Sequence, residues 1–345
     1  MRVTNCRGTR GTTEEVIGEV LVAATLALRL PVVRFLSCSL FVAFCLFAVR
    51  SYAASSNANA QRTDIANIDL PAMPAGGDAI VQYKRACGLL FDGHAVPDYG
   101  SALRLLRSSA SLHFAPAEFL LGYLYEHGRG VAVDYGKAAE YYLVAAQGGD
   151  AGAENNLGGM YEYGRGMAKD VNAAFKWFSA AAQHGNAMGQ YNLGTFYQLG
   201  YATPVDLERA AQWFRTAADQ GLAVAQANLA ICYFKGRGEP VDYALAAHWS
   251  QLAAEQGLPH AAMNYAYLCE HGMGVARDEL AAYVWYSRAL AGGDKSGAGH
   301  VKALARHLSK AQKEQAESQL AAMARKPVGA GMTAAEGDVT LLENP

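Results

Sequence analysis

The sequence repeats with a period of 36 residues, and this period constrains the fold more than any other feature. Equivalent positions of successive repeats, 36 residues apart, form a column. Glycine fills two such columns, aspartate and alanine fill one each, and tyrosine or tryptophan fills a fifth. A segment of this length cannot bury its apolar surface alone, so the period predicts a stack of identical units. The columns are Gly128, Gly164, Gly200, Gly236 and Gly272; Gly149, Gly185, Gly221, Gly257 and Gly293; Asp134, Asp170, Asp206, Asp242 and Asp278; Ala138, Ala174, Ala210, Ala246 and Ala282; and Tyr141, Trp177, Trp213, Trp249 and Trp285.

Each repeat has the pattern of two helices joined by a glycine turn. Leu157 and Tyr161 lie four residues apart, which is typical of the apolar stripe of a first helix, here named helix A. A glycine turn then ends helix A, because glycine adopts positive φ without a steric penalty. Asp170 stands where an N-cap is needed, and Ala174 and Trp177 mark the packing face of a second helix, helix B. The sequence therefore predicts stacked helical hairpins.

This pattern resembles the Sel1-like repeats, which are relatives of tetratricopeptide repeats with a longer turn between the two helices. The resemblance combines the spacing, the turn glycines, the aspartate cap and the aromatic column. It implies an all-α solenoid of αα-hairpin repeats that forms a right-handed superhelix. The resemblance covers residues 117–296 as five repeats and is fullest in 121–149, 157–185 and 229–257.

The solenoid is expected over residues 79–296, and some of its repeats depart from the pattern. A degenerate repeat at 81–116 has Asp92 and His94 in place of the turn glycines, and Ala202 replaces the second turn glycine of a central repeat. After the solenoid, Ser309 and Gln312 have the spacing of a capping box, which predicts a C-terminal capping helix over 297–326. We expect the remaining residues, 327–345, to form a disordered tail.

Residues 1–53 have the pattern of an export signal and not of a repeat. Residues 35–49 form an uncharged apolar run that follows two arginines, and Ser51-Tyr52-Ala53 resembles a small-x-small cleavage site. The run is shorter than the roughly 20 apolar residues of a membrane span. We therefore expect an exported protein, periplasmic or secreted, with residues 54–78 as a flexible linker. The alternative is that residues 35–49 remain uncleaved and anchor the chain in the inner membrane.

The composition argues against several classes of function. The 29 Lys and Arg residues nearly balance the 31 Asp and Glu residues, whereas a nucleic-acid-binding protein usually has a basic excess. The motifs of nucleotide-binding sites, metalloproteases and serine hydrolases are not found in the sequence. Beyond the export signal, Cys87, Cys232 and Cys269 lack the spacing of a zinc site or a disulfide framework, and the last two are expected in the core. We expect no cofactor, no metal, no catalytic residue, no small-molecule substrate and no nucleic-acid partner.

The resemblance to tetratricopeptide repeats implies that helix A lines a concave groove able to hold a peptide. An asparagine column at Asn156, Asn192, Asn228 and Asn264 has two interpretations: an amide ladder that pairs with a peptide backbone, or a set of ties between each hairpin and the preceding turn. Aromatic and polar neighbours on helix A suit protein recognition. The further candidate residues are Phe119, Tyr123, Glu126, Asn155, Glu162, Tyr191, Gln198, Lys235, Met263, Tyr267 and Glu270.

Together these features predict a non-catalytic scaffold or adaptor of the bacterial cell envelope. Its partner is expected to be a protein or peptide bound on the concave face, with membrane contact only through an uncleaved N-terminal segment. One alternative is a secreted Sel1-like enzyme of the β-lactam hydrolase type, although those relatives carry regular cysteine pairs that this chain lacks. The other alternative is a membrane-tethered structural protein.

Overall fold

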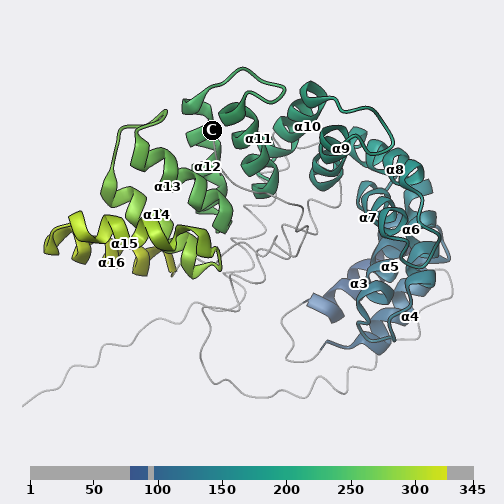
Figure 1. Ribbon diagram of the computed structural model, residues 1–345. Coiled ribbons are helices and arrows are strands. Elements are labelled where there is room, and N and C mark those ends of the chain that lie inside the picture. The colour runs from purple at the N-terminus through teal and green to yellow at the C-terminus, as the bar shows by residue number, and fades with distance from the viewer. Residues whose placement is uncertain (1–77, 92–96, 325–345) are drawn as a thin grey trace, which may run out of the picture. The chain divides into compact units, whose positions relative to one another are not determined.

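The computed structural model describes residues 78–91 and 97–324, and within these ranges the chain forms helices and turns without a β-strand (Figure 1). The chain divides into two compact units, residues 1–72 with 90–97, and residues 73–89 with 98–345. The first unit lies almost wholly outside the described residues. The expected export signal, the expected tail, Asp92, His94 and nearly all of the expected linker also lie outside them.

Twelve α-helices of the described part alternate as helix A and helix B of six consecutive hairpins. From α5 onward, each helix A packs against its own helix B, and each helix B packs against the next helix A. This arrangement confirms the all-α solenoid of hairpin repeats. The A helices are α3 (Ala79–Phe91), α5 (Ala115–His127), α7 (Ala151–Tyr163), α9 (Ala187–Leu199), α11 (Ala223–Lys235) and α13 (Pro259–His271). The B helices are α4 (Tyr99–Ala110), α6 (Tyr135–Gln147), α8 (Val171–Gln183), α10 (Leu207–Asp219), α12 (Tyr243–Glu255) and α14 (Glu279–Ala291).

The aspartate column caps helix B in every hairpin, as the sequence predicts. In α8, the carboxylate of Asp170 accepts hydrogen bonds from the backbone N–H groups of Asn172 at 2.9 Å and Ala173 at 3.0 Å. These are amides that the start of a helix leaves without an intrahelical acceptor. The cap therefore fixes where each helix B begins. The same contact is made by Asp98, Asp134, Asp206, Asp242 and Asp278.

The second glycine of the turn between helix A and helix B touches the preceding hairpin. A Cβ atom at Gly166 would lie 2.2 Å from the carbonyl oxygen of Tyr135, and one at Gly238 would lie 2.0 Å from that of Leu207. Tyr135 and Leu207 are the first residues of α6 and α10, so each turn rests on the start of the preceding helix B. Because real Cβ atoms do not approach a backbone oxygen this closely, glycine is required at positions 166 and 238 for stacking as well as for its positive φ.

Ala202 occupies this second turn position between α9 and α10 and keeps the left-handed conformation, with φ at 56°. This conformation costs a residue with a Cβ about 1 kcal/mol. We expect Ala202→Gly to raise the free energy of unfolding by about 0.5 to 1 kcal/mol, measured by urea unfolding. Ala303→Gly is the matched control, because Ala303 is exposed in the middle of α15 (Ala298–His307) and its replacement should lower stability by about 1 kcal/mol. Equal losses from both substitutions would contradict the account.

In five of the six described hairpins, one large side chain fills the core beside a small residue of helix A, and Ser250 is the exception. Phe178 of α8 is 1% exposed, and a Cβ atom at Gly158 of α7 would lie 2.7 Å from its ring. Trp177 packs at the edge of the core and is half buried. The core position therefore belongs to the residue after the tryptophan column. This ring column consists of Leu106, Tyr142, Phe178, Phe214, Ser250 and Tyr286.

The C-terminal segment differs from the single capping helix expected over 297–326. A short 3-10 helix (Lys295–Gly297) and α15 (Ala298–His307) together occupy the register of a seventh helix A, and α16 (Lys310–Ala324) follows. The apolar and small columns of helix A continue into this segment, because a helix A that lacks its own helix B still has to cover the last hairpin. Gly297, Val301 and Leu304 stand 36 residues after Ala261, Tyr265 and Leu268.

The capping box predicted at Ser309 opens α16. The backbone N–H of Ser309 donates to Oε1 of Gln312 at 2.9 Å, and the N–H of Gln312 donates to Oγ of Ser309 at 3.3 Å. Each side chain satisfies a backbone group that the helix start leaves free. The resulting helix packs against α14 and covers part of the last hairpin.

Candidate partner-binding face

The candidate partner-binding face consists of the fifteen helix-A residues that the sequence singles out. Tyr191, Met263 and Asn264 are buried, at 5%, 9% and 3% exposure, and they offer almost no area to a partner. The other twelve are half buried, so part of each side chain is open to solvent. They are Phe119, Tyr123, Glu126, Asn155, Asn156, Glu162, Asn192, Gln198, Asn228, Lys235, Tyr267 and Glu270.

The asparagine column is largely occupied by contacts within the protein. Nδ2 of Asn192 donates to Oδ1 of Asn155 in the preceding hairpin at 2.9 Å. Oδ1 of Asn156 accepts from Nδ2 of Asn155 in the same helix at 3.3 Å, and Nδ2 of Asn228 donates to the Val224 carbonyl, one turn earlier in α11, at 2.9 Å. Of these contacts, the one made by Asn192 joins two hairpins, as the interpretation of the asparagines as ties predicts, whereas the other two lie within one helix. Together the contacts leave few amide groups for a peptide ladder.

A carboxylate column runs along the same face, at the last residue but one of helix A. The hydroxyl of Tyr142 donates to Oε2 of Glu126 at 2.7 Å, and that of Tyr286 donates to Oε2 of Glu270 at 2.8 Å. Burial, together with the neighbouring carboxylate, raises the pKa of both tyrosines far above the usual value, so they remain donors at neutral pH. Burial also raises the pKa of Glu162, against the opposing attraction of a lysine. Two of these carboxylates are thus fixed in place by buried tyrosines.

Two identical tyrosine–histidine pairs lie on this face, four repeats apart. The rings of Tyr123 and His127 have centroids 4.1 Å apart, as do those of Tyr267 and His271. In both pairs Nδ1 of the histidine contacts the tyrosine carbonyl oxygen, at 3.0 and 2.9 Å. Arg129 lies over the Tyr123 ring, 5.2 Å from its centroid. These partly exposed rings are held in position by their neighbours, which suits them to act as anchors for a partner.

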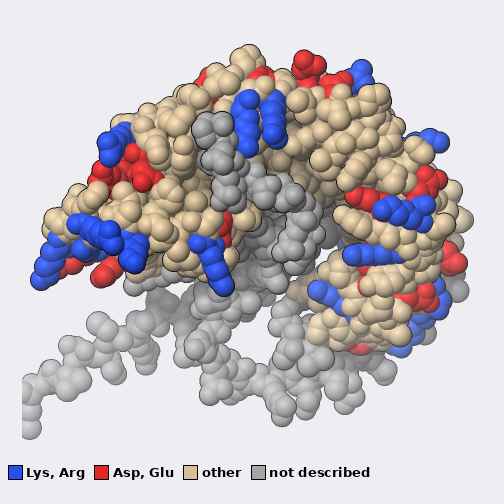
Figure 2. Space-filling view, in the orientation of Figure 1, with Lys and Arg blue, Asp and Glu red and all other residues tan. Residues whose placement is uncertain are grey.

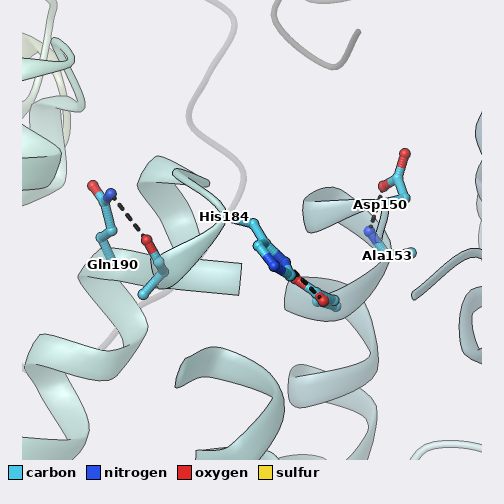
Figure 3. Close-up of polar contacts among 6 residues, drawn as sticks. Asp150, Ala153, His184 and Gln190 are labelled. Carbon is cyan, nitrogen blue, oxygen red and sulfur yellow. Dashed lines mark hydrogen bonds and ion pairs between the residues drawn. The ribbon is translucent and has the colours of Figure 1, made fainter. Parts of the chain in front are cut away.

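A buried polar column near the start of helix A was missed by the sequence reasoning. Nε2 of Gln220, at the end of helix B, donates to Oε1 of Gln190 at 2.7 Å, and Nε2 of Gln190 donates to the Ala182 carbonyl at 3.3 Å. In the preceding hairpin, Nδ1 of His184 contacts the Glu154 carboxylate at 2.8 Å (Figure 3). The column therefore pins the two helices of a hairpin together. Its signal is a Glu or Gln every 36 residues within an apolar helix: Glu118, Glu154, Gln190 and Gln226.

Glu118 is the exception in this column, because glycine (Gly148) stands where the next hairpin has His184. Glu118 is 4% exposed, and burial raises its pKa, partly offset by attraction to His113. A raised folded-state pKa means that the group favours folding at low pH and that this contribution is lost as pH rises through the folded pKa. We expect Glu118→Gln to raise the free energy of unfolding by about 1 kcal/mol at pH 7, with the gain disappearing near pH 4.

Urea unfolding at both pH values measures this effect. Glu154→Gln is the matched control, because the Glu154 carboxylate has His184 as its partner and should show no gain at pH 7. A loss of stability in Glu118→Gln at pH 7 would contradict the interpretation.

The side chains described contain no group of three His, Cys, Asp or Glu residues placed to hold a metal ion. Cys232 and Cys269 are buried, as expected, and burial raises the pKa of Cys232 to about 11, which keeps its thiol protonated at neutral pH. Lys and Arg side chains alternate with Asp and Glu over the face seen in Figure 2.

Comparison with known proteins agrees with this architecture. Sel1 repeats match residues 79–114, 115–150, 151–186, 187–222, 223–258 and 259–294, so the first hairpin is a full member of the series and each repeat begins two residues earlier than expected. No curated protein sequence matches the chain significantly.

Two solved structures show the same fold. A protective antigen of uropathogenic Escherichia coli with an SLR fold is 32% identical with a TM-score of 0.65, and the match covers 72% of this chain. This chain spans only 53% of that antigen. A Sel1 repeat protein from Oxalobacter formigenes is 27% identical with a TM-score of 0.57, covering 72% of this chain and 96% of that one. The chain therefore belongs to the Sel1 repeat family, whose solenoids generally serve in protein–protein interaction.

Proposed function

We propose that this chain is a non-catalytic adaptor that holds a polypeptide partner on its helix-A face. The observation that supports the proposal most directly is the repeated display of half-buried aromatic and carboxylate groups in register along that face. Groups held rigid by packing lose little conformational entropy on binding, so their contact area contributes efficiently to affinity. The Tyr123 and Tyr267 rings are the anchors, because aromatic side chains dominate the energetics of such interfaces.

The carboxylate column favours a partner that presents hydrogen-bond donors. In both Glu126 and Glu270 the Oε2 atom accepts from a tyrosine, while Oε1 has no hydrogen bond to any described residue. A carboxylate already held in position accepts charge-assisted hydrogen bonds at low entropic cost. The partner is therefore expected to place backbone N–H groups or Lys and Arg side chains along this column.

A pull-down from an envelope extract tests the proposal. The variant carrying Tyr123→Ser and Tyr267→Ser should recover at least about tenfold less partner than the unmodified protein. The matched control carries Val144→Ser and Leu290→Ser, which alter exposed apolar side chains of α6 and α14, at 40% and 36% exposure, and should recover partner normally. Unchanged recovery by a folded double-tyrosine variant would contradict the proposal.

We also propose that the adaptor is exported and works in the periplasm or outside the cell. The support is the apolar run at residues 35–49 with its basic flank and cleavage-like site. Among the described residues, no helix is long and apolar enough to cross a membrane. N-terminal sequencing of the mature protein tests this: a start near Ala54 supports export with cleavage, whereas a start at Met1 favours the membrane-anchored alternative.

A further inference from the structure

Two hairpins that lie four repeats apart carry the same set of four side chains. Helix A of each hairpin supplies a tyrosine, a glutamate and a histidine, and helix B supplies a second tyrosine from the ring column. The other four hairpins lack this combination. We name the two sets cluster 1 and cluster 2. Cluster 1 consists of Tyr123, Glu126, His127 and Tyr142, and cluster 2 consists of Tyr267, Glu270, His271 and Tyr286.

The two clusters also share their geometry. The helix-B tyrosine donates to Oε2 of the glutamate, at 2.7 Å in cluster 1 and 2.8 Å in cluster 2. The helix-A tyrosine lies against the histidine ring, with centroids 4.1 Å apart in both clusters. The next hairpin after cluster 1 has other residues at three of the four positions, namely Gly159, Tyr163 and Phe178. The shared geometry is therefore a property of these two hairpins and not of the repeat in general.

Each cluster leaves two acceptor atoms open. Oε1 of Glu126 and Oε1 of Glu270 have no hydrogen bond to any described residue. In both histidines Nδ1 contacts a carbonyl oxygen, which can only accept, so Nδ1 carries the proton and Nε2 of the neutral ring is an acceptor. The two glutamates are half buried and the two histidines are exposed, so solvent reaches all four side chains.

The surroundings of the clusters differ in one charged or titratable group each. In cluster 1, Arg129 lies over the Tyr123 ring, 5.2 Å from its centroid. In cluster 2, Nδ1 of His300 in α15 contacts Oε2 of Glu270 at 2.8 Å. Neither contact uses Oε1 of the glutamate, so both clusters keep the same open carboxylate oxygen.

We propose that the two clusters are equivalent subsites for two arginine side chains of one polypeptide partner. A guanidinium group is a planar cation with five N–H donors, so it can pair with the carboxylate and also reach a second acceptor beside it. The glutamate is already held by a tyrosine hydroxyl, so it loses little freedom when it pairs. This inference rests on the proposed function, and it adds that the partner presents the same group twice.

An arginine probe tests the subsites without knowledge of the partner. N-acetyl-arginine methylamide is titrated into the unmodified protein at pH 8, where histidine is ordinarily uncharged, and the ring NMR signals of His127 and His271 are followed. We expect both signals to shift saturably, with dissociation constants on the order of 10 mM. N-acetyl-citrulline methylamide has nearly the same shape and no charge, and it should bind at least about fivefold more weakly.

Three glutamate variants complete the titration. Glu126→Gln should abolish the response of His127 and keep that of His271, and Glu270→Gln should do the reverse, because glutamine still accepts from the tyrosine but carries no charge. Glu162→Gln is the matched control, because Glu162 stands in the same column without the tyrosines and the histidine. Its replacement should leave both responses unchanged. Equal binding of the two probes, or a response at only one cluster, would overturn the inference.

The pull-down connects the subsites to the partner. Glu126→Gln and Glu270→Gln should each lower partner recovery at least about threefold, whereas Glu162→Gln should not. Recovery that depends on the tyrosines Tyr123 and Tyr267 but not on these two glutamates would overturn the arginine subsites and leave the adaptor proposal standing. Recovery that depends on neither set would overturn both.

Discussion

Replacing Gly238 by alanine is expected to lower the free energy of unfolding by about 4 kcal/mol. Two effects add. Gly238 has φ at 74°, a conformation that penalises any residue with a Cβ, and the new Cβ would lie 2.0 Å from the Leu207 carbonyl oxygen. The second contact cannot be relieved by turning a side chain, because the obstacle is the backbone of the preceding hairpin. Urea or thermal unfolding measures the loss.

Gly221→Ala separates the two effects. Gly221 has φ at 87°, and no atom lies within 4 Å of the position of its Cβ. Its replacement should therefore cost only the conformational penalty of about 1 to 2 kcal/mol. The difference between the two variants measures how closely the turn approaches the preceding hairpin. Equal losses would show that the turn does not rest on that hairpin.

Replacing Phe178 by alanine is expected to cost about 4 kcal/mol, because its ring is 1% exposed and fills the core between α7, α8 and α9. The ring contacts Phe196 of α9 edge-on, with centroids 5.2 Å apart, so its loss weakens the junction between two hairpins as well as one hairpin. Chemical unfolding monitored by helical circular dichroism measures the effect.

Ser250→Ala is the matched control for this prediction. Ser250 occupies the same column in α12, is 2% exposed and is already small, so its replacement should change stability by less than about 1 kcal/mol. If Phe178→Ala were as mild as Ser250→Ala, the ring column would not be the core of the stack.

The architecture could be predicted from the sequence because each column records a local requirement. Asp170 caps a helix with its own backbone neighbours, and Gly164 ends a helix within a few residues, so both roles follow from position along the chain. The same logic correctly placed Ser309 at the start of α16. The capping helix expected over 297–326 is two helices, and the repeat register of the first of them was missed, although Val301 and Leu304 continue the apolar columns, because the turn glycines that mark a repeat are missing there.

Interactions between hairpins were less accessible to sequence reasoning. Gly238 lies against the backbone of Leu207, which stands 31 residues earlier in the sequence. The turn pattern around Gly238 predicts its positive φ but not that contact. Similarly, Asn192 and Asn264 share one column but differ in partners, since Asn192 finds Asn155 and Asn264 has no partner for its Oδ1 atom. Membership of a column predicts where in its hairpin a residue lies. The contacts that its side chain makes depend on which residues of the adjacent hairpin lie next to it.

Site-specific photocrosslinking in intact cells tests the central claim, that the helix-A face holds a protein partner. A photoreactive phenylalanine analogue is placed at Tyr123 or Tyr267 on the helix-A face, and at Val144 or Leu290 on exposed positions of helix B. The account predicts covalent adducts to one common protein from the two helix-A positions and none from the two helix-B positions. Adducts formed only from the helix-B positions, or equally from all four, would contradict it.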